Sequence, residues 1–330
     1  MQSSGRWWKK SRSRIGTDAS LADAPSLNPI DGDRPLPKLS TQAPGSEPIV
    51  NAMTVDVEDF FQVQALAEAY PRAIWEAQSP RVERNTERIL SLFAEHGVKA
   101  TFFTLGWVAE RHKALTRRIA DDGHELASHG YEHVRADSQS RKEFAADVGR
   151  TKRILEDIAG VPVLGYRAAT FSIGRSNLWA FDVLADQGYG YSSSIYPIRH
   201  DNYGMPEASR FAFRPLAEGD FLEVPISTVR IGGCNWPCGG GGYFRLLPYA
   251  WSKYSIDRLN RRERQPSVFY FHPWEIDPGQ PRPGGLGLKT RVRHYTNLRG
   301  MEARLRRVLG DFRWDRMDRV FVPGPGAAPA

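Results

Sequence analysis

The stretch MTVDVEDFF, residues 53–61, places three carboxylates at the end of what otherwise reads as a buried strand. Burying an unpaired carboxylate costs on the order of several kcal/mol, which is comparable with the net stability of a domain. Because side chains alternate between the two faces of a strand, Asp56 and Glu58 point the same way, whereas Asp59 begins the opposite face or the next turn. The pair suits a metal ligand plus a base, and it equally suits loop acids that cap the following helix.

Short apolar runs and helical patterns alternate after this stretch. Further strands are predicted at KATFFTLG (99–106), HELASHG (124–130), VPVLGYRAA (161–169) and PSVFYFHPWEI (266–276). Helices are predicted over 79–98, 114–123, 138–160, 176–189 and 290–309. Ser79 and Ser176 are the expected caps of two of these helices. An alternation of this kind over about 140 residues predicts parallel βαβ units, hence a barrel or a doubly wound sheet.

Composition fits one large α/β domain or two ordinary ones, because 330 residues with 41% hydrophobic content can bury a sizeable core. Residues 1–48 read as a disordered leader and 323–330 as a frayed tail. The sequence CGGGGYFRLLPY (238–249) is too rich in glycine for a regular element to be expected. No apolar run of about 18 residues occurs, and the basic N-terminus lacks an apolar segment, so a cytoplasmic location is expected.

The net charge of +7 and the two cysteines indicate no separate function. Residues 257–319 hold 15 Lys and Arg against 8 Asp and Glu, which suits an anionic polymer, an acidic lipid face or nucleic acid. Without a nucleic-acid motif, a solvated helix face is the favoured interpretation, and no nucleic-acid partner is expected. Cys234 and Cys238 are interpreted as loop thiols, because a zinc site would need further ligands elsewhere.

Two histidines four residues apart, His129 and His133 in ASHGYEH, are candidate metal ligands. On a helical turn this spacing would put both imidazoles on one side, about 5 to 6 Å apart at their β-carbons, close enough to share one divalent ion. Neutral imidazole suits zinc, cobalt, nickel or iron, and a carboxylate as third ligand would leave positions open for water. Either histidine alone is more often structural.

His272 in FYFHPWE and Arg167 in GYRAATFS follow two other predicted strands. His272 could be a core histidine bonded to backbone, and Arg167 could hold a carboxylate or face solvent. All these candidates nevertheless fall at predicted strand C-termini, the edge at which parallel α/β folds assemble their active sites. That common position favours a single functional site.

In this order, TVDVED, SHGYEH, YRAATFS, DQGYGYSSSIYP and FYFHPWE resemble the five motifs of the polysaccharide deacetylase family, also called the NodB-homology or carbohydrate esterase 4 group. VDVEDFF, GGGGYFRLLPY and FYFHPWEID further resemble a subfamily encoded with exopolysaccharide and PEP-CTERM protein-sorting loci. The resemblance implies a NodB-homology core over 49–200 and a C-terminal domain of unknown function over 201–322. That second domain would return the 266–277 strand and His272 to the core.

The resemblance implies an irregular, incomplete (β/α) barrel that hydrolyses N-acetyl groups on sugars, a carbon–nitrogen bond other than a peptide bond. Asp56 would then be the general base, Arg167 its orienting partner and His272 the general acid. His129 and His133 would bind a divalent metal ion, zinc first, with cobalt or nickel as alternatives. Most members carry a second, metal-binding aspartate where this chain has Val57. Strand alternation makes Glu58 the replacement ligand, and Asp59 is its rival.

The implied substrate is an acetylated polysaccharide or oligosaccharide, namely an exopolysaccharide or its precursor, and peripheral contact with a membrane-bound polysaccharide-synthesis complex is a further expectation. Aromatic residues of the C-terminal segment could line a sugar groove or simply pack in the core: Trp236, Tyr243, Phe244, Tyr249 and Trp251. Two alternatives stay open. One is a hydrolase of a small amide or imide on the same scaffold, and the other is a carbohydrate-binding relative without turnover, which Val57 favours.

Overall fold

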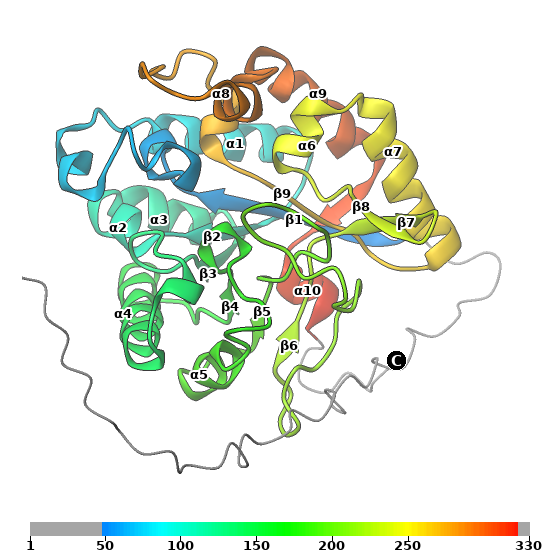
Figure 1. The fold of residues 1–330 in the computed structure, drawn as a ribbon, viewed down its shortest axis with the longest axis horizontal. Helices are drawn as coiled ribbons and strands as arrows, with labels where there is room; N and C mark the ends of the chain where they lie inside the picture. Colours follow the sequence, from blue (N-terminus) through cyan, green and yellow to red (C-terminus); the bar gives the residue numbers. More distant parts are fainter. Residues whose placement is uncertain (1–47, 323–330) are drawn as a thin grey trace, which may run out of the picture. The chain divides into compact units, whose positions relative to one another are not determined.

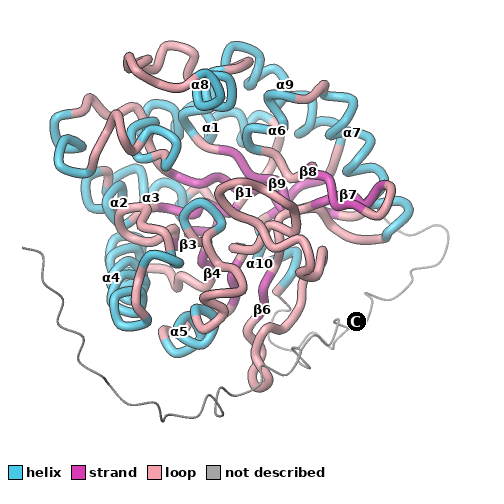
Figure 2. The backbone as a smooth tube through the Cα atoms, viewed as in Figure 1, coloured by secondary structure: helices cyan, strands magenta, loops and turns pink. Residues whose placement is uncertain are grey.

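A curved parallel sheet lies at the centre of the computed structural model, which describes residues 48–322, and helices pack outside it (Figures 1 and 2). The strands are β1 (Val50–Val57), β2 (Thr101–Thr104), β3 (Glu125–Ser128), β4 (Gly165–Tyr166), β5 (Tyr191–Ser192), β6 (Leu222–Glu223), β9 (Val268–Phe271) and β10 (Arg313–Asp315). Their order is β10-β1-β2-β3-β4-β5-β6, and β9 also pairs with β1. Within the described residues no strand pair joins β6 to β9, so the sheet forms an incomplete barrel. The predicted fold class is confirmed.

Helices alternate with these strands and bury their apolar faces against the sheet. They are α1 (Val82–Glu95), α2 (Gly106–Arg111), α3 (Lys113–Asp121), α4 (Arg141–Ala159), α5 (Ala180–Asp186), α6 (Gly241–Leu246), α7 (Tyr249–Arg258), α8 (Leu288–Tyr295), α9 (Leu298–Asp311) and α10 (Met317–Phe321). A small antiparallel hairpin, β7 (Thr228–Ile231) and β8 (Cys234–Pro237), lies apart from the main sheet. None of these helices is both long and apolar enough to cross a membrane.

The predicted leader (1–48) lies outside the described residues except for its last residue, and the predicted tail (323–330) lies wholly outside them. The predicted domain boundary near residue 200 stays a prediction. The sheet itself runs across that boundary, because β9 and β10 come from the C-terminal part of the chain and pair in parallel with β1. This return places His272 beside the carboxylates that follow β1.

Two predicted helix caps and one predicted continuous helix were wrong. Helix α1 begins at Val82 rather than at Ser79, and α5 begins at Ala180 with no side-chain cap, so Ser176 does not cap it. The helix predicted over 290–309 is two helices, because Asn297 adopts a left-handed conformation (φ 56°) between α8 and α9. Local caps and apolar periodicity cannot register such a break, because it depends on tertiary contacts.

The glycine-rich segment was also predicted wrongly, because it leads directly into α6. Gly240 has φ 105°, and a β-carbon there would lie 2.1 Å from the carbonyl oxygen of Tyr270 in β9. The amide of Tyr270 donates a 2.8 Å hydrogen bond to the carbonyl of Gly239. The glycines therefore let the backbone lie directly against β9, and α6 starts at the edge where that strand ends.

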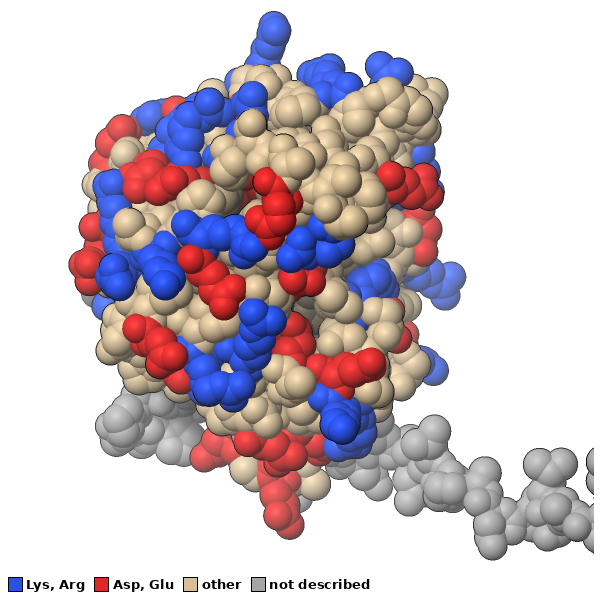
Figure 3. Space-filling model, turned by 90° about the vertical axis from the view of Figure 1, so that its left-hand side faces the viewer, with Lys and Arg blue, Asp and Glu red and all other residues tan. Residues whose placement is uncertain are grey.

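The basic C-terminal helices carry many of their charges in ion pairs. Arg306 of α9, for example, pairs with Glu95 and Glu302. On the face shown in Figure 3, basic and acidic side chains are interspersed, and no continuous basic surface forms there. This face has the mixed pattern of an ordinary solvated protein surface.

Candidate active site

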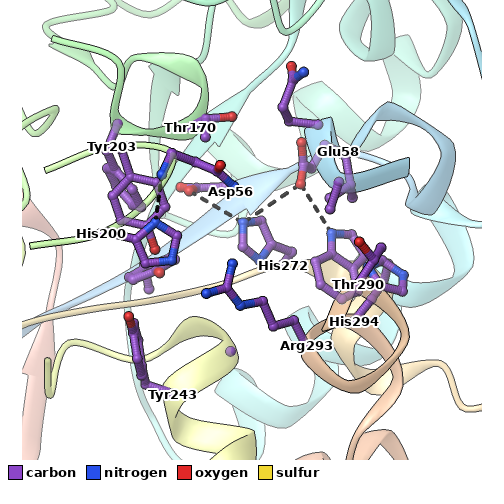
Figure 4. A pocket seen from close by; sticks show the side chains of 18 of the residues that line it. Asp56, Glu58, Thr170, His200, Tyr203, Tyr243, His272, Thr290, Arg293 and His294 are labelled. Carbon is purple, nitrogen blue, oxygen red and sulfur yellow. Dashed lines mark hydrogen bonds and ion pairs between the residues drawn. The ribbon is translucent and has the colours of Figure 1, made fainter. Parts of the chain in front are cut away.

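Five of the six predicted site residues line one cavity of about 410 Å³ (Figure 4), and the sixth, Arg167, forms an ion pair with Asp56. Each follows or ends a parallel strand: Asp56 and Glu58 at the end of β1, His129 and His133 after β3, Arg167 after β4 and His272 after β9. Asp56 and Glu58 face the cavity together, as strand alternation requires. The open edge of the sheet thus gathers these groups.

Asp56 is a buried carboxylate with one oxygen paired and the other turned toward the cavity. Its Oδ1 accepts a 2.6 Å hydrogen bond from Arg167, while Oδ2 lies 3.8 Å from Nε2 of His272. Burial alone would raise the pKa of Asp56, but the charges of Arg167, His129 and His272 and the hydrogen bond from Arg167 hold it below its ordinary value. Asp56 is therefore ionised at neutral pH, with Oδ2 free to accept a proton.

Arg167 is fully buried, and each of the three guanidinium nitrogens donates at least one hydrogen bond. It donates to Thr54 Oγ1 at 2.8 Å as well as to Asp56, and to the carbonyl and hydroxyl oxygens of Ser193 at 3.1 and 3.0 Å. Its plane lies over the ring of Phe103 at 4.0 Å. A buried guanidinium held in this way fixes the carboxylate of Asp56 in one orientation.

A second group of side chains fits a divalent metal ion. One ligand atom each of Glu58, His129 and His133 lies within 4.8 Å of the others, and all three residues are buried. Glu58 Oε1 accepts a 3.1 Å hydrogen bond from the indole of Trp274, whereas its buried Oε2 accepts none within the described chain. That oxygen lies 3.0 Å from Nε2 of His133. Two imidazoles with an unsatisfied carboxylate oxygen form a donor set typical of zinc.

Both histidines are neutral at neutral pH. Nδ1 of His129 lies 2.8 Å from the carbonyl oxygen of Arg167, so Nδ1 carries the proton and Nε2 keeps its lone pair for the metal. Burial is the main cause that lowers the pKa of His129 and of His133 to about 4. The predicted helical turn between them was wrong. They lie in a loop in which Gly130 (φ 76°) and His133 (φ 56°) are left-handed, with ring centroids 5.2 Å apart.

Asp59 points away from the cavity and holds backbone amides. Its carboxylate accepts from the amide of Phe60 at 2.8 Å and from those of Arg81 and Val82 at 2.5 and 2.8 Å. The last two begin α1, so Asp59 caps that helix from 22 residues upstream. The alternation of side chains along the strand thus places Asp56 and Glu58 in the cavity, and it leaves Asp59 at a helix N-terminus.

His272 is part of a buried chain of charges that extends into the C-terminal segment. Its Nδ1 lies 2.7 Å from Oε1 of Glu275, and Oε2 of Glu275 accepts a 2.5 Å hydrogen bond from Arg245 of α6. Burial alone would lower the pKa of His272, but the hydrogen bond to Glu275 and the charges of Glu58, Glu275 and Asp56 raise it to about 9. His272 is therefore protonated at neutral pH, and its Nε2 faces both carboxylates (Figure 4).

Glu275, Arg245 and Trp274 were not predicted as site residues. Trp274 stacks between His272 and His294, at centroid distances of 5.1 and 4.2 Å, and also donates to Glu58. The spacing of His272 and Glu275, three residues apart after a strand, is a signal that could have identified the glutamate. Nothing in the sequence near Arg245 indicates its partner.

The other C-terminal candidates are divided between surface and core. Tyr243 lines the cavity, whereas Phe244 and Tyr249 are buried in the core, and Trp236 is 50% exposed elsewhere. Cys234 and Cys238 are free thiols, and they do not belong to the metal-binding group found among residues 48–322.

Two family descriptions match this chain. Residues 75–191 match the polysaccharide deacetylase family, and residues 193–322 match a domain of unknown function, DUF3473. The fold is similar to that of a crystal structure from Mycobacterium smegmatis assigned to the polysaccharide deacetylases. The alignment of the two structures has a TM-score of 0.55 and 21% sequence identity, and it covers 86% of this chain and 93% of the other. At this identity the likeness concerns the fold alone.

Curated relatives are similar over shorter stretches. A peptidoglycan deacetylase of Helicobacter pylori is 28% identical over 42% of this chain and 52% of its own length. A chitooligosaccharide deacetylase of Rhizobium leguminosarum bv. trifolii is 32% identical over 30% of this chain and 44% of its own length. A peptidoglycan-N-acetylglucosamine deacetylase of Bacillus cereus is 37% identical over 23% of this chain and 27% of its own length. The chain thus spans about half or less of these relatives. Residues 75–191 are thus similar to the polysaccharide deacetylase family, and the similarity to a domain of unknown function begins at residue 193.

Proposed function

We propose that this protein is a metal-dependent N-deacetylase that acts on N-acetylhexosamine units of an exopolysaccharide or its precursor. One observation carries the proposal: the buried group of Glu58, His129 and His133 lies beside an ionised Asp56 whose free oxygen faces the same cavity. The polysaccharide deacetylase match and the sugar deacetylases among the relatives support the substrate class.

Glu58, His129 and His133 would hold the metal ion, with zinc the first candidate and cobalt or nickel the alternatives. When bound, such an ion polarises the acetyl carbonyl and makes water a better nucleophile. The arrangement replaces the metal-binding aspartate of the family, for which this chain has Val57. Val57 is buried in the core, and Glu58, one position further on, supplies the carboxylate instead.

The chain's own acid and base line the same cavity, with Nε2 of His272 3.8 Å from Oδ2 of Asp56. Asp56 Oδ2 accepts the proton of the water that adds to the acetyl carbon. His272 donates its Nε2 proton to the amide nitrogen as the carbon–nitrogen bond breaks, so acetate and an amine leave. Arg167 keeps Asp56 ionised between turnovers, and Glu275 keeps His272 protonated.

The loop after Arg167 is suited to stabilise the oxyanion through its backbone. Thr170 and Phe171 adopt consecutive left-handed conformations, φ 55° and 49°, and both line the cavity. Two non-glycine residues in that region cost on the order of 1 kcal/mol each or more, and such strain is concentrated at functional sites. The amides of Ala168 and Phe171 already donate to Ser194 and to the carbonyl of Ala168, so we infer that the strained backbone directs the amide hydrogens of residues 169 and 170 toward the reacting carbonyl.

A neighbouring cavity favours a sugar chain over a small metabolite as substrate. This second cavity, about 330 Å³, shares Phe171, Asn202 and Tyr203 with the catalytic one. Because they share these residues, the two cavities adjoin, and together they offer room for more than one sugar ring. The competing function, hydrolysis of a small amide or imide, would need only the inner part.

The test is hydrolysis of a substrate panel by the zinc-loaded full chain. The panel contains N-acetylglucosamine oligosaccharides of one to six sugars and, beside them, small linear and cyclic amides. We expect acetate and free amine in equal amounts, with kcat/KM rising with oligosaccharide length. Faster hydrolysis of the small amides would favour the competing enzyme. Sugar binding with no acetate from any member would favour a carbohydrate-binding relative without turnover.

A further inference from the structure

We propose that Lys289 and Arg293 form a subsite for an anionic group of the substrate, a carboxylate or a phosphate located about one sugar ring from the acetyl group. The proposal rests on the deacetylase function above and narrows its substrate class to charged saccharides. The two side chains come from α8, outside the residues assigned to catalysis or metal binding, and both line the catalytic cavity.

The position of these cations follows from their helix. Lys289 and Arg293 are four residues apart on α8, so both side chains lie on the helix face that borders the cavity. In Figure 4 the guanidinium of Arg293 points into the cavity, between His200 and His272. Arg291, on the same helix, does not line this cavity and lines another on the outer surface instead.

The backbone at Arg293 is held by Arg245, which also pairs with Glu275. Arg245 donates to the carbonyl of Arg293 at 2.9 Å and to that of His294 at 3.0 Å. Arg245 is buried and ion-paired with Glu275, the partner of His272. The backbone from which the Arg293 side chain projects is therefore fixed relative to the general acid, as a substrate-positioning group requires.

Near Lys289 and Arg293, the positively charged side chains outnumber the carboxylates. Lys289 and Arg293 share a single carboxylate, Asp201, whose oxygens lie 3.1 and 3.2 Å from Nη1 of Arg293. The nearby His200 lies 3.2 Å from Asp201, but burial is the main cause that lowers its pKa, so it adds no positive charge at neutral pH. The charge of Arg245 is balanced by Glu275. One positive charge and several N–H donors remain for a ligand.

This surplus charge lies in a more exposed part of the cavity than the catalytic carboxylates do. Asp56 and Glu58 are buried at its inner end, whereas the side chains of Lys289 and Arg293 are 65% and 40% exposed. The rings of Tyr203 and His200 also line the cavity and stack on each other at 4.0 Å with an angle of 15°, so the outward face of this stack is suited to a pyranose ring. A saccharide with its acetamido group at the inner end would place a neighbouring acidic substituent near the cations.

The experiment compares matched charged and neutral substrates in the zinc-loaded full chain. One arm uses N-acetylglucosamine linked to glucuronic acid against its glucose-linked counterpart, and the other uses N-acetylglucosamine 1-phosphate against the methyl glycoside. We expect kcat/KM to favour the anionic member of at least one pair by about tenfold, which corresponds to one charge-assisted hydrogen bond. Preference in the first arm alone identifies a uronic acid, and in the second alone a phosphate.

The variants Arg293→Gln and Lys289→Gln should reduce this preference to about twofold or less while hydrolysis of the neutral substrates continues. Arg291→Gln removes the same charge from the outer side of α8 and should retain the full preference. Equal rates for charged and neutral substrates in the wild-type protein would overturn the subsite but leave the deacetylase intact. Absence of acetate from all four substrates would instead contradict the function on which the subsite rests.

Discussion

The variant Asp56→Asn is expected to release acetate about 10²- to 10⁴-fold more slowly than the wild-type protein, because it loses the group that accepts the proton of the attacking water. The amide keeps the shape of the carboxylate, and Glu58, His129 and His133 are unchanged. Bound zinc should therefore stay near one equivalent. The measurement is kcat for acetate release together with zinc content of the purified variant.

Loss of folding has to be separated from loss of chemistry in this variant. Asp56→Asn removes the countercharge of the fully buried Arg167, and breaking a buried pair costs about 3–5 kcal/mol. Activity is therefore measured well below the melting temperature of the variant, with circular dichroism as the check that it is folded. A folded, zinc-loaded Asp56→Asn protein whose kcat is within threefold of wild type would rule out Asp56 as the base.

The variant Glu275→Gln should shift the alkaline limit of activity to lower pH. His272 has to be protonated to donate to the leaving amine, and its pKa of about 9 means that activity falls as pH rises through that region. Removing the Glu275 charge weakens the hydrogen bond to His272 and removes an attraction, both of which raise this pKa, so His272 loses its proton at lower pH. We expect the alkaline limb of kcat/KM to move down by about one pH unit or more.

The matched control for this effect is Glu275→Asp, which keeps a carboxylate beside His272. The alkaline limb of kcat/KM for this variant should stay close to that of the wild type, even if the shorter side chain lowers the overall rate. Because Glu275 also balances Arg245, both variants need a stability measurement alongside the pH profile. An alkaline limb that is the same in Glu275→Gln and wild type would mean that Glu275 does not tune His272.

The sequence predicted the strand ends better than the connections between them. Alternation along β1 placed Asp56 and Glu58 on one face correctly, because a strand has a strict two-residue period. His129 and His133 were correctly brought together, but for the wrong reason. Their loop depends on left-handed backbone at His133, a conformation that spacing alone does not indicate.

What the sequence could not predict depends on contacts made late in the chain. Arg245 reaches Glu275 only because Gly240 lets the chain lie against β9, and this close approach is a tertiary feature. The glycine run was therefore misread as irregular. Asp59 likewise caps a helix that begins more than 20 residues later, so no local pattern links the carboxylate to the amides it holds.

We propose that sugar deacetylation requires a metal ion held by Glu58, His129 and His133. The direct measurement is acetate release from N-acetylglucosamine oligosaccharides by protein stripped with EDTA, before and after addition of one equivalent of zinc. It is made on the wild type, on Glu58→Gln and on Asp59→Asn. The last variant is the matched control, because it removes the same charge from the adjacent carboxylate, which caps α1.

We expect wild type and Asp59→Asn to lose activity with EDTA and to regain it with zinc. Asp59→Asn should be less stable by about 1 kcal/mol, because a weaker cap remains. Glu58→Gln should bind zinc at least about tenfold more weakly and regain little activity. Full acetate release by the stripped wild type would contradict a metal-dependent reaction. Zinc rescue of Glu58→Gln but not of Asp59→Asn would contradict Glu58 as the carboxylate ligand.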